Sequence, residues 1–481
     1  MEYEGTKLVV KYNEPPKFEK KSIGDAKTVT EAQREVQVIR EADVIVVGGG
    51  PGGIAAAVSA ARGGAKTILI ERYGHLGGMA SGGLVNIIPG LSNRHGEQLI
   101  GGFCHEIIQR LAARGGASFP EKQYWGTSEP ALVEKYLKSN MKHFCLREIE
   151  NGEHVILYTA VLDPEIAKDE MNTVVLEAGA ELLLHTWVTA PIMEGDTVKG
   201  VIVESKSGRQ ALLAKVVIDS TGDGDLLPFT GTEIDEYMES GTRIAQLGWV
   251  YWICNVDLEK YEHFANTEPE KLKEIIDEIY RQKAYPIFFR GLLDNQEGVV
   301  WVHRLIGSLH QTDIEEMTHV DVTTRRQSVF SWELLKKMMP GFEKSFLMQT
   351  SPQLGTSGGR RIRGEYYMTK ADFNAEAPFE DTIAIFAADG RGSDPPPKHD
   401  RTYVPYRALV PRVTEGLLVG CRAFSSDYEV QERYNLIPHC MCFGQAAGSA
   451  AAIAVRDNVS VRDIDFAKLR EELLKHGAIL P

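Results

Sequence analysis

The feature that most constrains the fold of this chain is the segment DVIVVGGGPGGIAAA, which begins at Asp43. Its apolar run, glycine-rich turn and run of small residues predict a buried strand from Ala42, a tight turn and a helix. The run KTILIE follows as a second buried strand and ends at Glu71. Strands that are apolar on both faces indicate a parallel sheet covered by helices, so we expect an α/β fold.

The glycine-rich turn has the spacing of a dinucleotide-binding site. Gly48, Gly50 and Gly53 satisfy Gly-x-Gly-x-x-Gly, and Pro51 and Gly52 lie within the same turn. The first glycine makes the turn, the second lets the backbone approach a pyrophosphate, and the third lets helix and strand pack closely. An acid at the end of the next strand, here Glu71, accepts hydrogen bonds from an adenosine ribose. The alternative is a glycine-rich turn in another kind of α/β protein.

Later segments favour FAD over NAD. Glu71 is followed by RYGHLGGMASGG, with a second Gly-Gly turn, instead of a further strand and helix. The run AKVVIDSTGDGDL, from Ala214, predicts a buried strand that ends in an acidic turn. GLLVGCRAFSS predicts another strand, and HCMCFGQAAGSAAAIAV a small-residue helix. Several segments that return to one sheet imply a cofactor longer than a simple NAD cleft holds.

The length of 481 residues allows two or three domains. A helix over 163–180 followed by the strand ELLLHTWV fits the first domain, whereas 235–345 lacks the strand-turn-helix rhythm. We expect a discontinuous Rossmann-like FAD-binding domain with an inserted α+β substrate domain. The predicted segments are an N-terminal arm (1–40), the FAD-binding domain (41–85, 155–235 and 405–462), the substrate or cap domain (86–154 and 236–404) and a C-terminal helix (463–481). The pattern Ser460-x-x-Asp463 predicts the start of this last helix.

Five further segments carry a family resemblance over roughly residues 40–475. They are LGGMAS (76–81), IDSTGDGDL (218–226), PGFEKSFLMQTSPQLGTSGGRRIRGEY (340–366), YRALVPRVTEGLLVGCR and PHCMCFGQAAGSAAA. With these motifs the chain resembles the FAD-dependent oxidoreductases of the glutathione-reductase-like, fumarate-reductase-related superfamily, and within it a bacterial group with an LGG(M/T)A(T/S) turn. The resemblance implies an interrupted FAD domain and flavin redox chemistry. It does not imply one substrate.

The resemblance also implies which residues contact FAD. Gly48, Gly50 and Gly53 would hold the pyrophosphate and Glu71 the ribose. The other implied contacts are Arg72, Gly77, Gly78 and Met79 on the ribityl and adenosine side, Val188 at the adenine, Gly222 and Asp223 at the phosphates, and Gly420, Arg422, Pro438, Cys440 and Met441 beside the isoalloxazine.

Three residues are candidates for the chemistry on the substrate. His439 precedes the helix expected to face the flavin, and the usual histidine pKa suits proton transfer near neutrality. The alternative is a histidine that caps this helix or hydrogen-bonds the flavin. Arg360 and Arg361 could clamp a carboxylate or an oxyanion through paired hydrogen bonds. Alternatively, they form ion pairs with Glu365 or Asp223 that hold the domains together.

Other polar residues are weaker candidates. Tyr366 and His303 are expected to be structural, and the position of His75 does not fit the relatives in which a histidine is linked to flavin. Cys440 and Cys442 are separated by one residue in an apolar helix, which favours buried thiols over a metal or redox pair. We predict no metal site.

The composition of the chain limits which classes of partner it is expected to bind. The 67 acidic and 53 basic residues give a net charge of −14, which disfavours nucleic acid. Six scattered cysteines do not form a disulfide framework, and no targeting or membrane-spanning segment stands out, so we expect a cytoplasmic protein. A homodimer is expected only because the family resemblance implies one.

The predicted function is an FAD-dependent oxidoreductase that transfers a hydride between flavin N5 and a small organic substrate with hydroxyl, carbonyl or carboxylate groups. A second Gly-x-Gly-x-x-Gly and a Cys-x-x-x-x-Cys pair are missing from the sequence, which argues against a disulfide reductase. The electron donor or acceptor stays open. The alternatives are a tRNA-modifying flavoprotein, which salt-sensitive tRNA binding would support, and a non-catalytic binding protein of the same fold, which would lack flavin colour.

Overall fold

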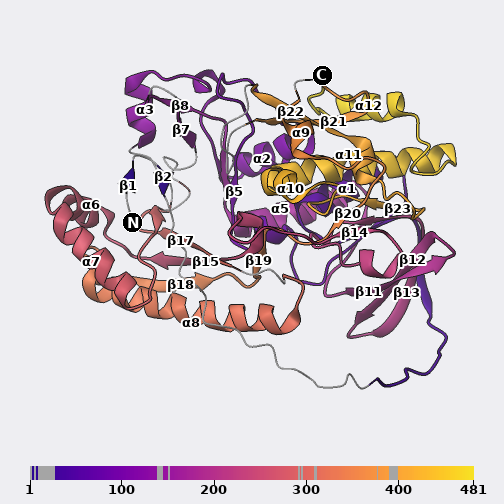
Figure 1. The fold of residues 1–481 in the computed structure, drawn as a ribbon, viewed down its shortest axis with the longest axis horizontal. Coiled ribbons are helices and arrows are strands. Elements are labelled where there is room, and N and C mark those ends of the chain that lie inside the picture. The colour runs from indigo at the N-terminus through magenta and orange to yellow at the C-terminus, as the bar shows by residue number, and fades with distance from the viewer. Residues whose placement is uncertain are drawn as a thin grey trace.

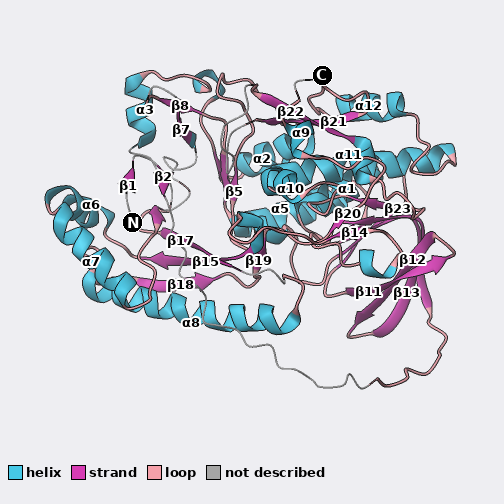
Figure 2. Ribbon diagram, in the orientation of Figure 1, coloured by secondary structure: helices cyan, strands magenta, loops and turns pink. Residues whose placement is uncertain are grey.

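A seven-stranded sheet assembled from distant segments carries the glycine-rich turn (Figures 1 and 2). In the computed structural model, which describes residues 3–4, 7–8, 28–137, 145–149, 152–290, 293, 296–307, 311–375, 377–388 and 399–481, the strand order is β10-β4-β3-β13-β12-β11, with β23 beside β13. The strands are β3 (Val38–Val47), β4 (Thr67–Ile70), β10 (Glu181–Leu183), β11 (Trp187–Glu194), β12 (Thr197–Ser205), β13 (Gly208–Asp219) and β23 (Leu417–Val419). The α/β class is confirmed.

The carboxyl ends of four parallel strands meet at one edge of this sheet. β3 runs parallel to β4 and β13, and β13 runs parallel to β23. The strands therefore end together at Val47, Ile70, Asp219 and Val419. In open α/β sheets, ligands bind outside this edge. The antiparallel strands β11 and β12 extend the sheet on the far side of β13.

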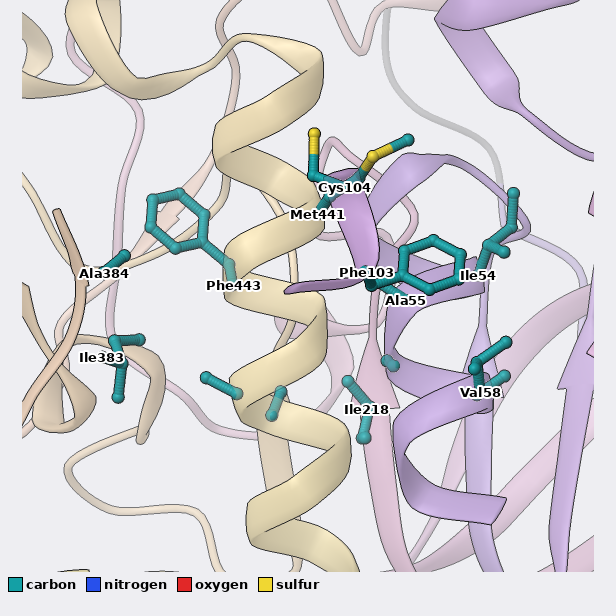
Figure 3. Packing of buried hydrophobic residues seen from close by; sticks show 14 of the residues in the cluster. Ile54, Ala55, Val58, Phe103, Cys104, Ile218, Ile383, Ala384, Met441 and Phe443 are labelled. Atoms are coloured by element: carbon teal, nitrogen blue, oxygen red, sulfur yellow. The ribbon is translucent and has the colours of Figure 1, made fainter. Parts of the chain in front are cut away.

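Helices α1 (Pro51–Arg62) and α11 (Ile437–Asp457) pack against each other on one face of the sheet (Figure 3). Their small residues allow the backbones to approach closely. A Cβ at Gly444 would lie 1.9 Å from the carbonyl oxygen of Gly52, and one at Gly448 would lie 2.1 Å from that of Ala56. The C-terminal helix α11 is thereby fixed over the first helix of the glycine-rich turn.

A second sheet lies to one side of the first, in the order β16-β17-β15-β18 with β19 beside β15 (Figure 1). One face packs against helices α7 and α8 through an apolar cluster. On the other face, Trp301 Nε1 donates a hydrogen bond to the Leu84 carbonyl (3.0 Å). The elements of this region are β15 (Gln246–Cys254), α6 (Leu258–Thr267), α7 (Pro269–Arg281), β16 (Phe289–Arg290), β17 (Val300–Gly307), α8 (Ile314–Met338), β18 (Phe346–Thr350) and β19 (Gly355–Thr356).

Shorter elements connect and cover the two sheets. The helices are α2 (Gly102–Ala113), α3 (Pro130–Leu137), α5 (Pro164–Glu177), α9 (Lys370–Phe373), α10 (Tyr428–Tyr434) and α12 (Phe466–Lys475). The strands are β1 (Tyr3–Glu4), β2 (Lys7–Leu8), β5 (Ile87–Ile88), β6 (Ala117–Ser118), β7 (Leu146–Glu148), β8 (His154–Ile156), β9 (Ala160–Leu162), β14 (Ile234–Asp235), β20 (Arg361–Ile362), β21 (Thr382–Ala387) and β22 (Arg401–Pro405).

Three predicted element boundaries are wrong. The first strand begins at Val38, inside the predicted arm, because its start pairs with β13. The single strand predicted over 181–188 is divided into β10 and β11, since His185 has a φ of 53°, which extended strands do not allow. The last helix is capped by Asp465, whereas Ser460 donates to Glu415 instead.

Within the described ranges, no single helix is both long enough and apolar enough to cross a membrane. Helices α10 and α11 together meet these criteria, but they are bent by 99° where they join.

Candidate functional site

A groove runs along the carboxyl edge of the large sheet and encloses about 1050 Å³ of space that is continuous with solvent. Turns after all four parallel strands contribute to it. Thirteen of the residues predicted to contact FAD line this groove: Gly48, Gly50, Pro51, Gly52, Glu71, Arg72, Gly78, Met79, Val188, Gly222, Asp223, Arg422 and Cys440.

The glycine-rich turn forms a cradle at the start of α1. A Cβ at Gly53 would lie 1.7 Å from the carbonyl oxygen of Gly48, so Gly53 permits the close contact of helix and strand. A Cβ at Gly50 would meet no described atom within 4 Å and would enter the groove instead. The helix begins with Pro51, and no described side chain caps it. Its first N–H groups and its partial positive charge can therefore hold phosphate oxygens.

Glu71 is fixed at the next strand end. Its buried carboxylate accepts hydrogen bonds from the backbone N–H groups of Gly49 (2.6 Å) and Tyr73 (2.8 Å). Each carboxylate oxygen has a further lone pair with which it can accept a ribose hydroxyl. Beside it, the Arg72 guanidinium lies 5.2 Å from the ring centroid of Trp187, which lines the groove. This end of the groove suits an adenosine.

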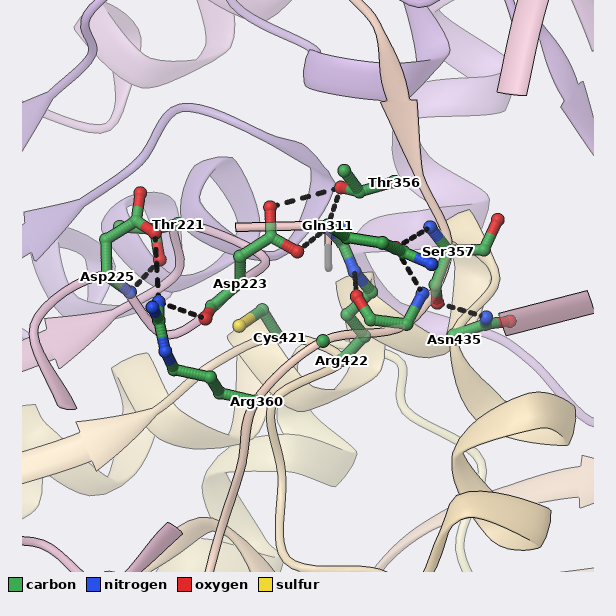
Figure 4. Close-up of polar contacts among 12 residues, drawn as sticks. Thr221, Asp223, Asp225, Gln311, Thr356, Ser357, Arg360, Cys421, Arg422 and Asn435 are labelled. Carbon is green, nitrogen blue, oxygen red and sulfur yellow. Dashed lines mark hydrogen bonds and ion pairs between the residues drawn. The ribbon is translucent and has the colours of Figure 1, made fainter. Parts of the chain in front are cut away.

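Polar contacts join the third and fourth strand ends (Figure 4). Arg422 Nη2 forms an ion pair with Asp223 Oδ1 (2.7 Å) and also donates to Thr356 of β19. A Cβ at Gly222 would lie 2.7 Å from Arg422 Nη1, so this turn approaches the guanidinium closely. The buried Asp219 carboxylate accepts from the Leu226 N–H (3.1 Å), and burial raises the pKa of Asp219. The result is a rigid polar floor between the two sheets.

Asp225 lies on the same side of the groove, 3.7 Å from Arg72 and 3.8 Å from Arg360. Burial, together with the charges of Asp223 and Asp219, raises the pKa of Asp225 to about 6. The folded, flavin-free protein therefore holds this proton at pH values where the unfolded chain has lost it. For this group, stability is greatest at low pH and falls as the pH rises through about 6.

Replacing Asp225 with asparagine is therefore expected to remove a pH-dependent destabilisation. Relative to the wild type, the flavin-free variant should gain thermal stability as the pH rises from about 4 to about 6, the interval between the carboxyl pKa values of the unfolded and folded chain, and the gain should then stay constant up to pH 8. Melting temperatures of both proteins across this range check the effect. A constant difference in melting temperature over the whole range would contradict the assignment.

Five predicted cofactor residues do not line the groove but position residues that do. Gly53 and Gly420 are packing positions; a Cβ at Gly52 would lie 2.0 Å from the Gly420 carbonyl oxygen. Gly77, with a φ of 106°, donates its N–H to the Gly49 carbonyl (2.8 Å). The other two belong to α11: Pro438 lies in its first turn, and Met441 is buried in the main core.

The two predicted substrate arginines have different environments. Arg361 is fully buried, and its five N–H donors have five partners: Asp235 and Gln431 and the carbonyls of Tyr237, Gly359 and Ser426. No donor is left for a substrate, so the prediction of a clamp is wrong for Arg361, and the structural alternative holds with different partners. Arg360 pairs with Glu236 (3.0 Å) and donates to the Asp223 carbonyl (3.4 Å) next to the groove.

His439 lies in the first turn of α11, as expected, but its ring packs on Phe386 (4.1 Å between centroids) and near Tyr434 (5.5 Å). It does not line the groove, whereas the next residue, Cys440, does. Burial raises the pKa of the Cys440 thiol to about 11, so it stays protonated near neutral pH. The thiol therefore serves as a small apolar wall of the groove.

Sequence reasoning missed several residues that line the groove. From the second sheet and its helix these are Met317, Gln353, Leu354 and Thr356, and near the adenosine end they are Tyr73 and Trp187. Tyr73 and Trp187 are next in the sequence to the predicted contacts Arg72 and Val188, so their position beside these residues could have indicated that they line the groove. The other four lie far along the chain. Gln353, Leu354 and Thr356 belong to the family segment 340–366, to which no cofactor contact was assigned, whereas Met317 lies outside the family segments, and the tertiary structure brings all four to the groove.

Four strand ends, a glycine cradle and a fixed ribose acid define a dinucleotide-binding α/β protein. The family comparison narrows the class: residues 43–473 match the family model described as "FAD dependent oxidoreductase". The chain belongs to this family of FAD-dependent enzymes. The glycine-lined space at α1, which side chains would fill, fits the cofactor.

Curated relatives are similar over part of their length. A thiamine thiazole synthase of Methanococcus vannielii is 27% identical over 190 residues, which is 38% of this chain and 56% of that protein. A digeranylgeranylglycerophospholipid reductase of Methanoculleus marisnigri is 30% identical over 180 residues, 37% of this chain and 38% of that protein. The matched segment thus spans about half or less of these relatives, whose names differ in reaction and substrate.

Among solved structures, a geranylgeranyl bacteriochlorophyll reductase-like protein from Thermoplasma acidophilum is similar with a TM-score of 0.39 and 16% identity. The match covers 91% of this chain and 82% of that one.

Proposed function

We propose that this enzyme oxidises or reduces a small organic molecule that bears a hydroxyl, carbonyl or carboxylate group. One observation carries the proposal: the groove that begins at the ribose acid Glu71 ends between Cys440 of α11 and residues of the second sheet and its β18–β19 loop, among them Thr356 and Gln353. Polar side chains of a second unit thus meet the far end of the cofactor groove, where a substrate must contact the reactive ring.

When bound, FAD supplies a site at N5 that accepts or donates a hydride. The chain must then position the substrate and provide polar contacts for its oxygen atoms. Arg422 is held by Asp223 and Thr356 and keeps a positive charge at this end of the groove. Gln353 Oε1 has no hydrogen-bond partner among the described residues and can accept a hydrogen bond from a substrate hydroxyl.

His303 lies on the face of the second sheet that covers this region. Its Nε2 lies 3.5 Å from the position of a Cβ at Gly248, and a Cβ at the neighbouring Gly355 would lie 2.6 Å from Met79 of the groove. Burial and the nearby charge of Arg243 lower the pKa of His303 to about 4. A neutral imidazole at neutral pH can donate a hydrogen bond to a substrate oxygen without bringing a charge.

His303→Gln and His439→Gln separate the two candidate histidines. We expect His303→Gln to keep its flavin but to lower kcat by about 10²–10³, the usual effect of losing one such donor. His439→Gln should change the stability of the aromatic cluster around Phe386 more than it changes turnover. Steady-state kinetics with flavin content measured in parallel check this, and a slow His439→Gln enzyme beside a normal His303→Gln enzyme would reverse the assignment.

The function is tested by anaerobic titration of the purified flavoprotein. We expect one class among alcohols, hydroxy acids and hydride donors to bleach the yellow flavin band, or one class among enoates and ketones to restore it after dithionite reduction. A protein that binds FAD normally but responds to none of these compounds would contradict the proposal. Even with that outcome, a loss of the flavin band when the glycines of the cradle are substituted would confirm the cofactor site.

A further inference from the structure

A charged arginine lies buried inside the second sheet on the side away from the groove. Arg304 of β17 is 7% exposed, and its Nη1 is buried with no hydrogen-bond partner among the described residues. Side chains alternate along a strand, so Arg304 faces α7 and α8, whereas His303 lies on the opposite face of the sheet. The residue does not belong to the site described above.

Other buried arginines of this chain have a carboxylate partner. Arg361 pairs with Asp235 at 3.1 Å, and Arg422 pairs with Asp223 at 2.7 Å. For Arg304, no carboxylate of the described residues lies within ion-pair distance. A guanidinium does not give up its proton in proteins, so it cannot escape the cost of burial by becoming neutral.

The surroundings of Arg304 are aromatic hydroxyl groups. Its guanidinium lies 5.7 Å from the ring centroid of Tyr285, and Tyr251 and Tyr280 are close enough to act on its charge. Tyr251 Oη is buried beside Ser331 of α8 without a hydrogen bond of normal geometry. Burial raises the pKa values of Tyr251 and Tyr280, so both hydroxyls stay protonated and supply donors, not negative charge.

We propose that Arg304, Tyr251 and Tyr280 form a binding site for a small monoanion, such as a halide or the carboxylate of a small organic acid. Arg304 Nη1 and Tyr251 Oη are buried donors without a partner on the same face of the sheet, and no carboxylate of the described residues lies within ion-pair distance of the guanidinium, which is the complement of such an ion. The anion would join the sheet to α7 and α8, so its binding stabilises this part of the fold. The inference does not depend on the proposed reaction.

The test compares melting temperatures of the flavin-containing protein at constant ionic strength. Gluconate, which is bulky, is replaced stepwise by bromide or by formate. We expect the wild type and Arg326→Met, an exposed arginine of α8, to be stabilised by either or both small anions. Arg304→Met should show no such response and, in gluconate, should be at least as stable as the wild type because it lacks the uncompensated charge. If only bromide or only formate stabilises the wild type, the result shows whether the site binds a halide or a carboxylate.

A second variant and a direct measurement keep the test decisive if Arg304→Met does not fold. Tyr251→Phe keeps the charge but removes one donor, and it should raise the half-maximal anion concentration by about tenfold or more. Crystals soaked in bromide should show anomalous scattering beside Arg304 in the wild type. The proposal would be overturned if both variants responded to the anions as strongly as the wild type does, or, where Arg304→Met is unfolded, if Tyr251→Phe did so. It would also be overturned if the wild type responded to neither anion and its crystals lacked this peak.

Discussion

Replacing Gly53 with valine is expected to yield a protein that has lost most of its bound FAD and part of its stability. The Cβ would lie 1.7 Å from the Gly48 carbonyl oxygen, so the strand, the turn and α1 would have to separate. Overpacking of this kind costs about 1–3 kcal/mol or more. Displacing the phosphate-binding N–H groups should weaken FAD binding by roughly tenfold to 100-fold or more.

Two matched variants distinguish the cradle from general damage. Gly50→Ala adds a methyl group that meets no described atom but enters the groove, so it should weaken FAD binding while the flavin-free protein melts normally. Gly307→Ala, at the exposed end of β17, also adds a methyl group in open space and should change neither property. Measurements of flavin content and melting temperature for the three variants check these expectations. Normal flavin content in Gly53→Val, or a Gly50→Ala variant that behaves like Gly307→Ala, would contradict the cradle.

Arg361→Met is expected to destabilise the protein by about 3–5 kcal/mol, the usual cost of removing one partner from a buried ion pair. The change removes one buried donor from the Asp235 carboxylate, which keeps the donors of Arg363, Tyr367 and the Tyr237 N–H, and it removes the Arg361 donors from three backbone carbonyls. Denaturant unfolding measures the loss. At temperatures well below the melting transition, KM should stay close to the wild-type value, because Arg361 has no donor left for a substrate.

Arg363→Met is the control for this experiment. Arg363 pairs with the same carboxylate, Asp235, at 3.3 Å, but its side chain is 42% exposed. Exposed pairs contribute about 0.2–1 kcal/mol, so this variant should be nearly as stable as the wild type. A stable Arg361→Met protein with a strongly raised KM would instead restore Arg361 as a substrate clamp.

Local sequence spacing was sufficient to predict the cradle. The strand that ends at Val47, the glycines and Glu71 act within one strand-turn-helix-strand unit, so the function of each follows from its distance along the chain. The same holds for α5, whose N-cap Asp163 stands directly before its first proline, Pro164. Elements of this kind carry their structural signal within a few residues.

Orientation within the site could not be predicted in this way. His439 does precede the expected helix, but its side chain packs on Phe386, a residue of β21 that no spacing rule connects with α11. Similarly, the partners of Arg361 come from three separate segments, near residues 235, 359 and 426–431. Which of two adjacent arginines faces a groove depends on such distant contacts, since the sequence shows only that both are charged.

The pairing of α1 with α11 has a consequence for the order in which the molecule forms. Almost every residue of α1 is buried, and much of what buries it is a helix near the other end of the chain. During synthesis, the first strand-turn-helix unit therefore emerges long before its partner, and loop closure over this separation is slow. The phosphate cradle is made early, yet the wall formed by Arg422 and Cys440 arrives late, so cofactor capture by the complete groove must follow translation of the C-terminal segments.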